Sequence, residues 1–181
     1  MTEKSGIIAV TERLTLRRLH EDDLSDLARL FGDPETMYAY EGAFSDAETR
    51  DWLDRMLRRY RDDGISLYAV ILNATGEFIG QCGLTMQDIH GARVVEVGYL
   101  FRREFWHCGY ATEAACACRD YAFSTLGVSE VYSIIHDTNL ASQGVAKRMG
   151  MTHTGEFTKH YRGIDMPHFI YRISSPGVNK I

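Results

Sequence analysis

Positive charge is scarce in this sequence. Its 181 residues include 20 Lys and Arg against 25 Asp and Glu, for a formal net charge of −5. Nucleic-acid binding depends on Lys and Arg clustered against phosphates, so this balance argues against a nucleic-acid partner. The basic stretch at 55–61 stands among aspartates on a helix pattern and is interpreted as a solvated, salt-bridged face. The electrostatic field of this net negative charge by itself favours a cationic partner.

Metal-binding and membrane-spanning patterns are missing as well. No CxxC pair occurs among the four cysteines, and the seven histidines are scattered without ligand spacing, so we expect no metal. Free thiols are typical of a reducing compartment. No apolar run approaches the length of a membrane span, and the first residues do not resemble a signal peptide. We therefore expect a cytoplasmic protein with no membrane partner.

Proline is also rare, with three residues, and no low-complexity tract is present. A chain of this length can bury one substantial core and is short for two. The sequence therefore predicts a single domain over residues 1–181, with 1–10 and 175–181 as flexible termini.

What is present is a regular succession of strand and helix patterns. Two-residue alternation or short apolar runs predict strands at 13–17, 65–72, 77–85, 94–101, 131–135, 152–160 and 168–173. Helical spacing predicts four helices: one with the acids at 21–23 in its first turn, one after the capping box at Ser45, one from Tyr110 to Gly127, and one from Asn139 to Gly150. The order β-α-α-β-β-β-α-β-α-β-β indicates a mixed α/β domain with a largely antiparallel sheet.

The stretch "FWHCGYATEA" at 105–114 joins a strand directly to the third helix. The first N–H groups of such a helix have no partner within it and can bind an anion. Gly109 permits close approach of a ligand, and Ala111 leaves room beside it. A glycine at this kind of turn can also be ordinary local geometry. Neither GxGxxG nor GxxxxGK[ST] is present, so a dinucleotide fold and a P-loop are not indicated.

The segments "VEVGYLFRREFWHCGYATEA" and "HDTNLASQGVAKRMGM" resemble the GNAT superfamily of N-acetyltransferases, and more closely its ribosomal-protein alanine acetyltransferase (RimJ/RimL-like) branch. The superfamily's pyrophosphate loop, Gln/Arg-x-x-Gly-x-Gly/Ala, falls on Trp106, Cys108, Gly109 and Ala111. Trp106 stands where the wider superfamily has Gln or Arg, and Cys108 departs from the branch's polar or basic residue. Because the loop binds through backbone N–H groups, neither departure should abolish binding.

The resemblance implies acetyl-CoA as the cosubstrate and a sheet that is splayed at its centre. Its pantetheine arm would pair with the backbone near Tyr99 and Phe101. Gly98 is expected to mark a bulge that parts the strands. The pyrophosphate would sit on the loop and first helical turn, formed by Trp106, His107, Cys108, Gly109, Tyr110, Ala111 and Thr112.

Acetyl transfer to an amine needs a general base near the nucleophile. Glu96 interrupts an apolar strand, and a buried carboxylate there would have a raised pKa, so it is the candidate base. It could instead turn to solvent or make a structural hydrogen bond. The superfamily's Tyr acid is missing, and the resemblance implies Ser142 in its place. Asn139 either caps its helix or binds the pantetheine amide, and both can hold.

The acceptor is not evident from the sequence. In the superfamily the last hairpin helps to form the acceptor pocket, which makes His160, Tyr161 and His168 candidates beside their ordinary reading as core or surface residues. The preferred function is transfer of an acetyl group from acetyl-CoA to a primary amine, on a protein N-terminus or a small molecule. The alternative is a catalytically inactive acyl-CoA-binding domain. The chain is expected to be a monomer or homodimer.

Overall fold

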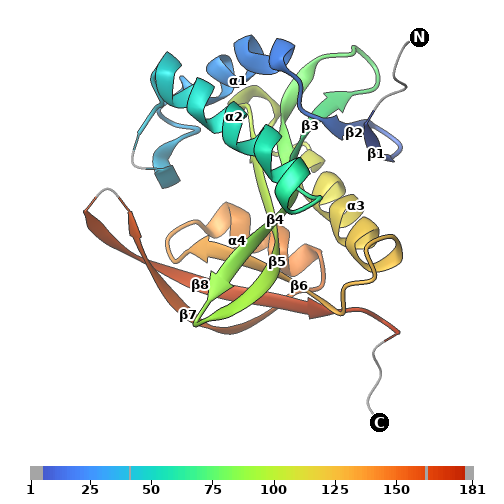
Figure 1. The fold of residues 1–181 in the computed structure, drawn as a ribbon, viewed down its shortest axis with the longest axis vertical. Helices are drawn as coiled ribbons and strands as arrows, with labels where there is room; N and C mark the ends of the chain where they lie inside the picture. The colour runs from blue at the N-terminus through green and yellow to red at the C-terminus, as the bar shows by residue number, and fades with distance from the viewer. Residues whose placement is uncertain (1–5, 41, 162, 178–181) are drawn as a thin grey trace.

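The fold is built on one mixed sheet (Figure 1). The structure is a computed structural model that describes residues 6–40, 42–161 and 163–177. Within them, eight strands pair in the order β1-β2-β3-β4-β5-β6-β8-β7, and every neighbouring pair is antiparallel except β5 with β6. The strands are β1 (Ile7–Val10), β2 (Leu14–Arg18), β3 (Leu67–Leu72), β4 (Phe78–Ile89), β5 (Ala92–Phe101), β6 (Glu130–His136), β7 (Thr152–Tyr161) and β8 (Ile164–Ser174).

The expected fold class is confirmed, with one strand added at the start. Residues 1–10 were predicted to be a flexible terminus, but Ile7–Val10 form β1 and pair with β2. The sequence signal is weak because β1 is a short edge strand whose end residues are exposed. At the other end, the Ser175 N–H donates to the Ser129 carbonyl at 2.8 Å. Residues 1–5 and 178–181 lie outside the described residues.

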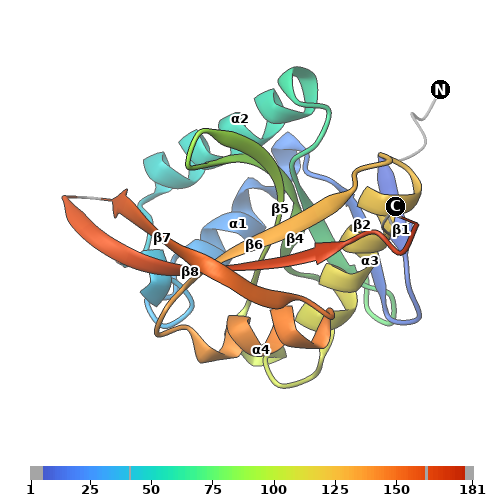
Figure 2. The same ribbon diagram turned by 90° about the horizontal axis from the view of Figure 1, so that it is seen from below.

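Helices cover both faces of the sheet (Figure 2). The first pair, α1 (Leu24–Phe31) and α2 (Asp46–Asp62), packs on one face, and α3 (Tyr110–Ser124) and α4 (Leu140–Arg148) pack on the other. The central strand β3 supplies Leu67 and Ala69 to the first core and Tyr68 and Val70 to the second. Burial on both faces explains why this strand is a continuous apolar run.

The start of α1 differs from the sequence prediction. The three acids at 21–23 form a separate short 3-10 turn (Glu21–Asp23) instead of the first turn of α1. Asp23 turns back, accepting the His20 N–H at 2.7 Å and both ends of the Arg17 guanidinium at 2.8 and 2.7 Å. Burial alone would raise the pKa of Asp23, but these bonds hold it below its ordinary value.

Candidate active site

A large cleft opens where the sheet parts between β5 and β6. These two strands pair in register only at Glu96 and Tyr132, whereas β5 stays paired with β4 along its whole length. The cleft has a volume of about 1260 Å³. It exceeds the usual range of roughly 300–1,000 Å³ for small-molecule pockets, so it suits a long ligand. Eleven of the twelve site residues expected from the sequence line it: Glu96, Tyr99, Phe101, Trp106, His107, Gly109, Tyr110, Ala111, Thr112, Asn139 and Ser142.

Two side chains bridge the strands at the point where they separate. The Ser133 hydroxyl on β6 donates to the Val97 carbonyl on β5 at 2.9 Å. In the other direction, the Ile134 N–H donates to Oε1 of Glu96 at 3.2 Å. These bonds satisfy backbone groups that the parted ladder would leave unpaired in a buried place. The expected bulge at Gly98 is absent from the β4–β5 pairing, whose register continues unbroken, so that part of the prediction is wrong.

Beyond the split, the edge of β5 is open to the cleft. Backbone groups of alternate residues point the same way in a strand, so those of Tyr99 point away from β4, as do those of Val97 and Phe101. The indole N–H of Trp106 already donates to the Phe101 carbonyl at 2.8 Å. Tyr99 therefore offers the open carbonyl for an extended ligand.

The N-terminus of α3 faces the cleft without a side-chain cap. Its N-cap, Gly109, has φ +82°, and His107 before it has φ +61°, so the loop turns twice through the left-handed region. The first N–H that bonds within the helix is that of Glu113, to the Gly109 carbonyl at 3.1 Å. The N–H groups of residues 109–112 precede it, and none of them has an acceptor among the described residues. At the positive end of a helix dipole, such groups can bind an anion.

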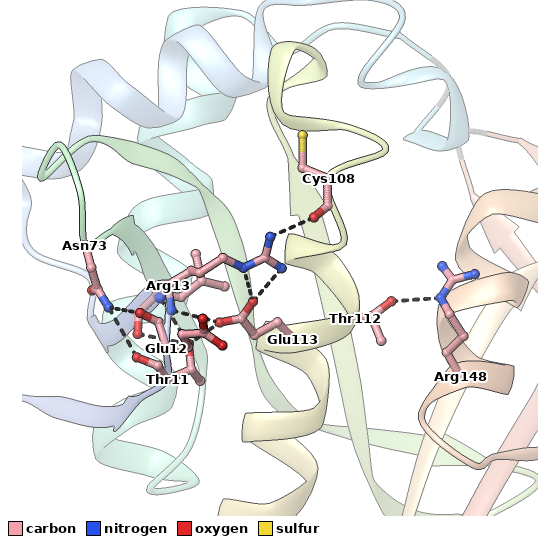
Figure 3. Close-up of polar contacts among 9 residues, drawn as sticks. Thr11, Glu12, Arg13, Asn73, Cys108, Thr112, Glu113 and Arg148 are labelled. Atoms are coloured by element: carbon pink, nitrogen blue, oxygen red, sulfur yellow. Dashed lines mark hydrogen bonds and ion pairs between the residues drawn. The ribbon is translucent and has the colours of Figure 1, made fainter.

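Residues at the turn of the β1–β2 hairpin contact this loop and the first turn of α3 (Figure 3). The Arg13 side chain donates to the Cys108 carbonyl at 3.0 Å and to Oε2 of Glu113 at 2.7 Å, and it covers the Tyr110 ring at 4.5 Å. Glu113 also accepts the Thr11 hydroxyl at 2.6 Å. Burial alone would raise the pKa of Glu113, but the Thr11 and Arg13 bonds hold it below its ordinary value. The loop is thus fixed to the sheet before any ligand arrives.

Cys108 is the expected site residue that does not line the cleft. Its side chain is exposed, and its thiol lies 3.4 Å from the Trp106 carbonyl. Its own carbonyl faces Arg13. An unusual side chain at this position is therefore compatible with an intact loop.

Arg148 is a cleft residue that the sequence analysis missed. It lies at the end of α4, and its Nε donates to the Thr112 hydroxyl at 3.0 Å (Figure 3). This places a full positive charge beside the uncapped helix N-terminus. A basic residue at the end of a helix is already explained by the helix dipole, so the sequence gave no indication of the contact between Arg148 and Thr112.

Glu96 is buried at the split in the sheet, with 8% of its surface exposed. Burial raises the pKa of its carboxyl, against the lowering effects of Lys159 and of the hydrogen bonds from the Ile134 N–H and the Thr85 hydroxyl. A carboxyl in such surroundings can take up a proton closer to neutral pH than an ordinary glutamate. The structural hydrogen bond considered from the sequence is also present, so the two interpretations of Glu96 are not exclusive.

Tyr99 and Asn139 fix the start of α4 against β5. The Tyr99 hydroxyl donates to the Ser142 carbonyl at 2.8 Å, and burial raises its pKa, so it stays protonated. The expected cap is confirmed, since Oδ1 of Asn139 accepts the Ser142 N–H at 3.0 Å. Ser142 is therefore held at the cleft by two contacts to its backbone.

The last hairpin supplies a further wall. His160 is exposed and lies 2.9 Å from Asp165. Nδ1 of His168 lies 2.7 Å from the Met166 carbonyl, and burial lowers its pKa, so the ring is neutral at pH 7 with Nε2 as the acceptor. Both line the cleft. The side chain of Tyr161 lies outside the described residues.

An aromatic cluster under α2 also lines the cleft and was not predicted. Tyr40 and Phe44 lie 6.1 and 5.9 Å from the Trp52 ring, and the Trp52 indole N–H donates to the Gln81 side chain at 3.3 Å. The sequence presents Trp52 as a core helix residue, and only the fold brings it to the cleft. In the described residues, no group of three or more His, Cys, Asp or Glu could hold a metal ion, and no helix is long and apolar enough to cross a membrane.

A parted sheet beside an uncapped helix N-terminus is an arrangement that can bind a long, anion-bearing ligand between its strands. The family model for the acetyltransferase (GNAT) domain matches residues 13–152. The chain is 37% identical over 167 residues to the uncharacterized protein YkkB of Bacillus subtilis (strain 168), covering 92% of this chain and 95% of the relative. It therefore belongs to the GNAT family, and it is an acetyl-CoA-dependent N-acetyltransferase.

Solved structures agree with this assignment. An acetyltransferase from Agrobacterium tumefaciens str. C58 superposes with a TM-score of 0.77 at 29% identity, over 92% of this chain and 94% of that one. RimL, a ribosomal alpha-N-protein acetyltransferase, gives a TM-score of 0.81 at 18% identity over 97% of each chain, a likeness that shows the fold alone. The superfamily resemblance found in the sequence is confirmed.

Proposed function

We propose that this protein transfers the acetyl group of acetyl-CoA directly to a primary amine, on a protein N-terminus or a small molecule. One observation carries the proposal: the N-terminus of α3 opens on the cleft at the parted sheet, and the N–H groups of residues 109–112 have no acceptor in the part of the chain that the structure describes. Such a terminus suits a pyrophosphate, and Arg148 adds a full charge beside it.

The donors along the cleft fit the rest of the cosubstrate. In this proposal the backbone of Tyr99, with the N–H of Phe101, holds the pantetheine arm as an added strand would be held. Asn139 can offer its side-chain amide to the arm while its oxygen caps α4. His107, Cys108 and Tyr110 contribute through their backbone in the phosphate loop, and Trp106 contributes by fixing the Phe101 carbonyl.

The chemistry needs a neutral amine and an acceptor for its proton. Bound acetyl-CoA supplies a thioester that the amine can attack. Glu96 is the proposed base, acting directly or through one water, and its raised pKa brings it nearer to the operating pH. The Ile134 N–H holds one of its oxygens and fixes the carboxyl at the split. The nearby charge of Lys159 also favours the neutral form of an incoming amine.

Ser142 is proposed to donate a hydrogen bond where the thiolate leaves. The position of its backbone is fixed by Tyr99 and Asn139, and Ser142 lines the cleft. A thiol has an ordinary pKa near ~8.5, so protonating the thiolate demands little from an acid. Ser142 therefore positions more than it protonates. A reducing compartment such as the cytoplasm suits the four free cysteines.

The test is acetyl transfer itself. The protein is incubated with acetyl-CoA and a panel of primary amines and N-terminal peptides. Thiol release is followed with a thiol-reactive chromophore, and the acceptor product is identified by mass spectrometry. The proposal expects thiol release that depends on an acceptor and matches the acetylated product in amount. Binding of coenzyme A with no turnover on any acceptor would contradict it.

A further inference from the structure

The wall that α2 contributes to the cleft is cationic. Trp52, Arg55 and Arg59 follow one another at helical spacing on one face of α2, and all three line the cleft. This helix lies on the opposite face of the sheet from α3 and α4 (Figure 2). The sheet therefore separates these two arginines from the N–H groups of residues 109–112 at the start of α3.

Neither arginine forms an ion pair in the part of the chain that the structure describes. By contrast, Arg50 on the same helix pairs with Glu21 and with Asp54. The Arg55 guanidinium lies 5.0 Å over the Trp52 ring, and Arg59 is half-buried. Burial and the nearby charge of Arg55 lower the pKa of Arg59, and this lowering exceeds the raising effects of Asp63 and Glu96.

The carboxylates near Arg59 are already engaged. Asp63 pairs with Arg93 at 3.0 Å. Glu96 accepts the Ile134 N–H at 3.2 Å and is the proposed base. A half-buried guanidinium whose acidic neighbours are taken retains unused donors that face the cleft.

A third cation approaches from the facing hairpin. Lys159 on β7 is half-buried, lines the cleft, and has the largest effect of any charged group on Glu96. It also forms no ion pair among the described residues. Among the described residues that line the cleft, the remaining carboxylate is that of Asp88, which accepts the Gly91 N–H at 2.9 Å in the β4–β5 turn.

The local charge of this end of the cleft is thus opposite to that of the whole chain. The net charge of −5 by itself favours a cationic acceptor. Three cations in the cleft that form no ion pair among the described residues act at much shorter range and outweigh that distant field, which solvent and salt screen. They would repel an acceptor whose remaining groups are positive.

We propose that Arg55, Arg59 and Lys159 bind an anionic group of the acceptor, so that the preferred substrates are primary amines carrying a carboxylate. This inference rests on the proposed function. The carboxylate can belong to a free amino acid or to an acidic side chain close to a peptide N-terminus. In both cases the guanidinium groups bind the carboxylate while the amine reaches Glu96 at the split. The aromatic cluster around Trp52 contacts the apolar part of the same molecule.

The experiment compares acceptors in matched pairs that differ only in this charge. The small-molecule arm uses alanine and alaninamide, and the peptide arm uses short peptides beginning Ser-Glu and Ser-Gln. Rates are expressed per neutral amine, because the two members of a pair differ in amine pKa. The expected result is a kcat/KM at least about 10-fold higher for the carboxylate partner in one arm, as for one charge-assisted hydrogen bond. The arm that shows the preference identifies the source of the carboxylate.

Substitutions on α2 then test whether its arginines cause the preference for a carboxylate. Arg59→Gln and Arg55→Gln are expected to lower the carboxylate-to-amide ratio about 10-fold each, mainly through KM, because the contact is made alike in the ground and transition states. Arg58→Gln is the matched control, since Arg58 is an exposed neighbour on α2 that does not line the cleft. It should leave the ratio unchanged.

Two outcomes would overturn the inference, and they can be told apart. If amines are acetylated without regard to the carboxylate, or if Arg58→Gln lowers the ratio as much as Arg59→Gln, the inference is wrong while the acetyl transfer activity stands. If coenzyme A binds but no acceptor of either kind is acetylated, the proposed function itself fails.

Discussion

Replacing Gly109 by alanine tests the phosphate loop with the smallest change in chemistry. The residue caps α3 at φ +82°, a conformation that an L side chain adopts at a cost of about 1–2 kcal/mol. A Cβ at this position would meet the Arg13 side chain at 3.4 Å, which is ordinary contact, so the cost is conformational and not steric. The loop of the free variant should relax to relieve this strain.

Binding of coenzyme A must then return the loop to its strained conformation, so the cost of the strain raises the dissociation constant. About 1–2 kcal/mol corresponds to a weakening of coenzyme A binding by roughly 5- to 30-fold. Calorimetric titration of coenzyme A into both proteins measures it. Once saturated, the variant should keep most of its turnover rate, because the loop lies away from the reacting atoms.

The matched control is Gly127→Ala, after the other end of the same helix. Gly127 has φ +67° with nothing within 4 Å of an added Cβ, so the strain is similar but remote from the cleft. Gly127→Ala should lower thermal stability and leave affinity unchanged, whereas Gly109→Ala should lower affinity and lose less stability, because its loop can relax in the free protein. If Gly109→Ala binds coenzyme A as tightly as the parent while losing stability like Gly127→Ala, the loop does not hold the ligand.

Three further predictions concern the base, the added cation and the fold. Glu96→Gln should lower kcat/KM by about 100-fold or more. It should also remove one of the two ionisations on the acid side of the plot of kcat/KM against pH; the other ionisation is that of the acceptor ammonium. Because burial makes the charged carboxyl costly, the melting temperature of that variant should not fall. An unchanged rate at neutral pH would rule out Glu96 as the base. Arg148→Gln should weaken coenzyme A binding at low salt more than at high salt, and a salt-independent loss would contradict a direct phosphate contact. Asp23→Asn should lower the free energy of unfolding by about 2 kcal/mol in urea titrations, with the exposed Asp22→Asn as control. The pKa of Asp23 is depressed in the folded state, so the Asp23 carboxylate stabilises the fold above the ordinary Asp pKa, and this stabilisation is lost as pH falls through the depressed pKa. Equal losses of unfolding free energy in Asp23→Asn and Asp22→Asn would refute a stabilising role for the Asp23 contact.

Local chemistry explains which parts of this fold could be predicted from the sequence. The capping box at Ser45 marks the start of α2, and Asn139 marks that of α4, because each satisfies helix N–H groups within three residues. The apolar run of β3 reflects burial on both faces of the sheet. These signals need no knowledge of distant residues.

The missed features depend on contacts between distant segments. The split in the sheet is bridged by Glu96 with Ile134 and by Ser133 with Val97, pairs 38 and 36 residues apart. A glycine in the strand suggested a bulge instead, because local pattern gives no information about the neighbouring strand. Arg148 at the cleft and the cationic wall of α2 also appear only once the helices are placed.

The amides themselves provide the most direct test of the central claim, that the backbone of residues 107–112 holds the pyrophosphate. Amide spectra of nitrogen-labelled protein can be recorded during titration with coenzyme A and, separately, with pantetheine, which lacks the phosphates. Coenzyme A is expected to shift the N–H signals of residues 109–112 strongly, whereas pantetheine is expected to leave them nearly unmoved. Large shifts confined to other parts of the chain, with these four signals unchanged at saturation, would contradict the claim.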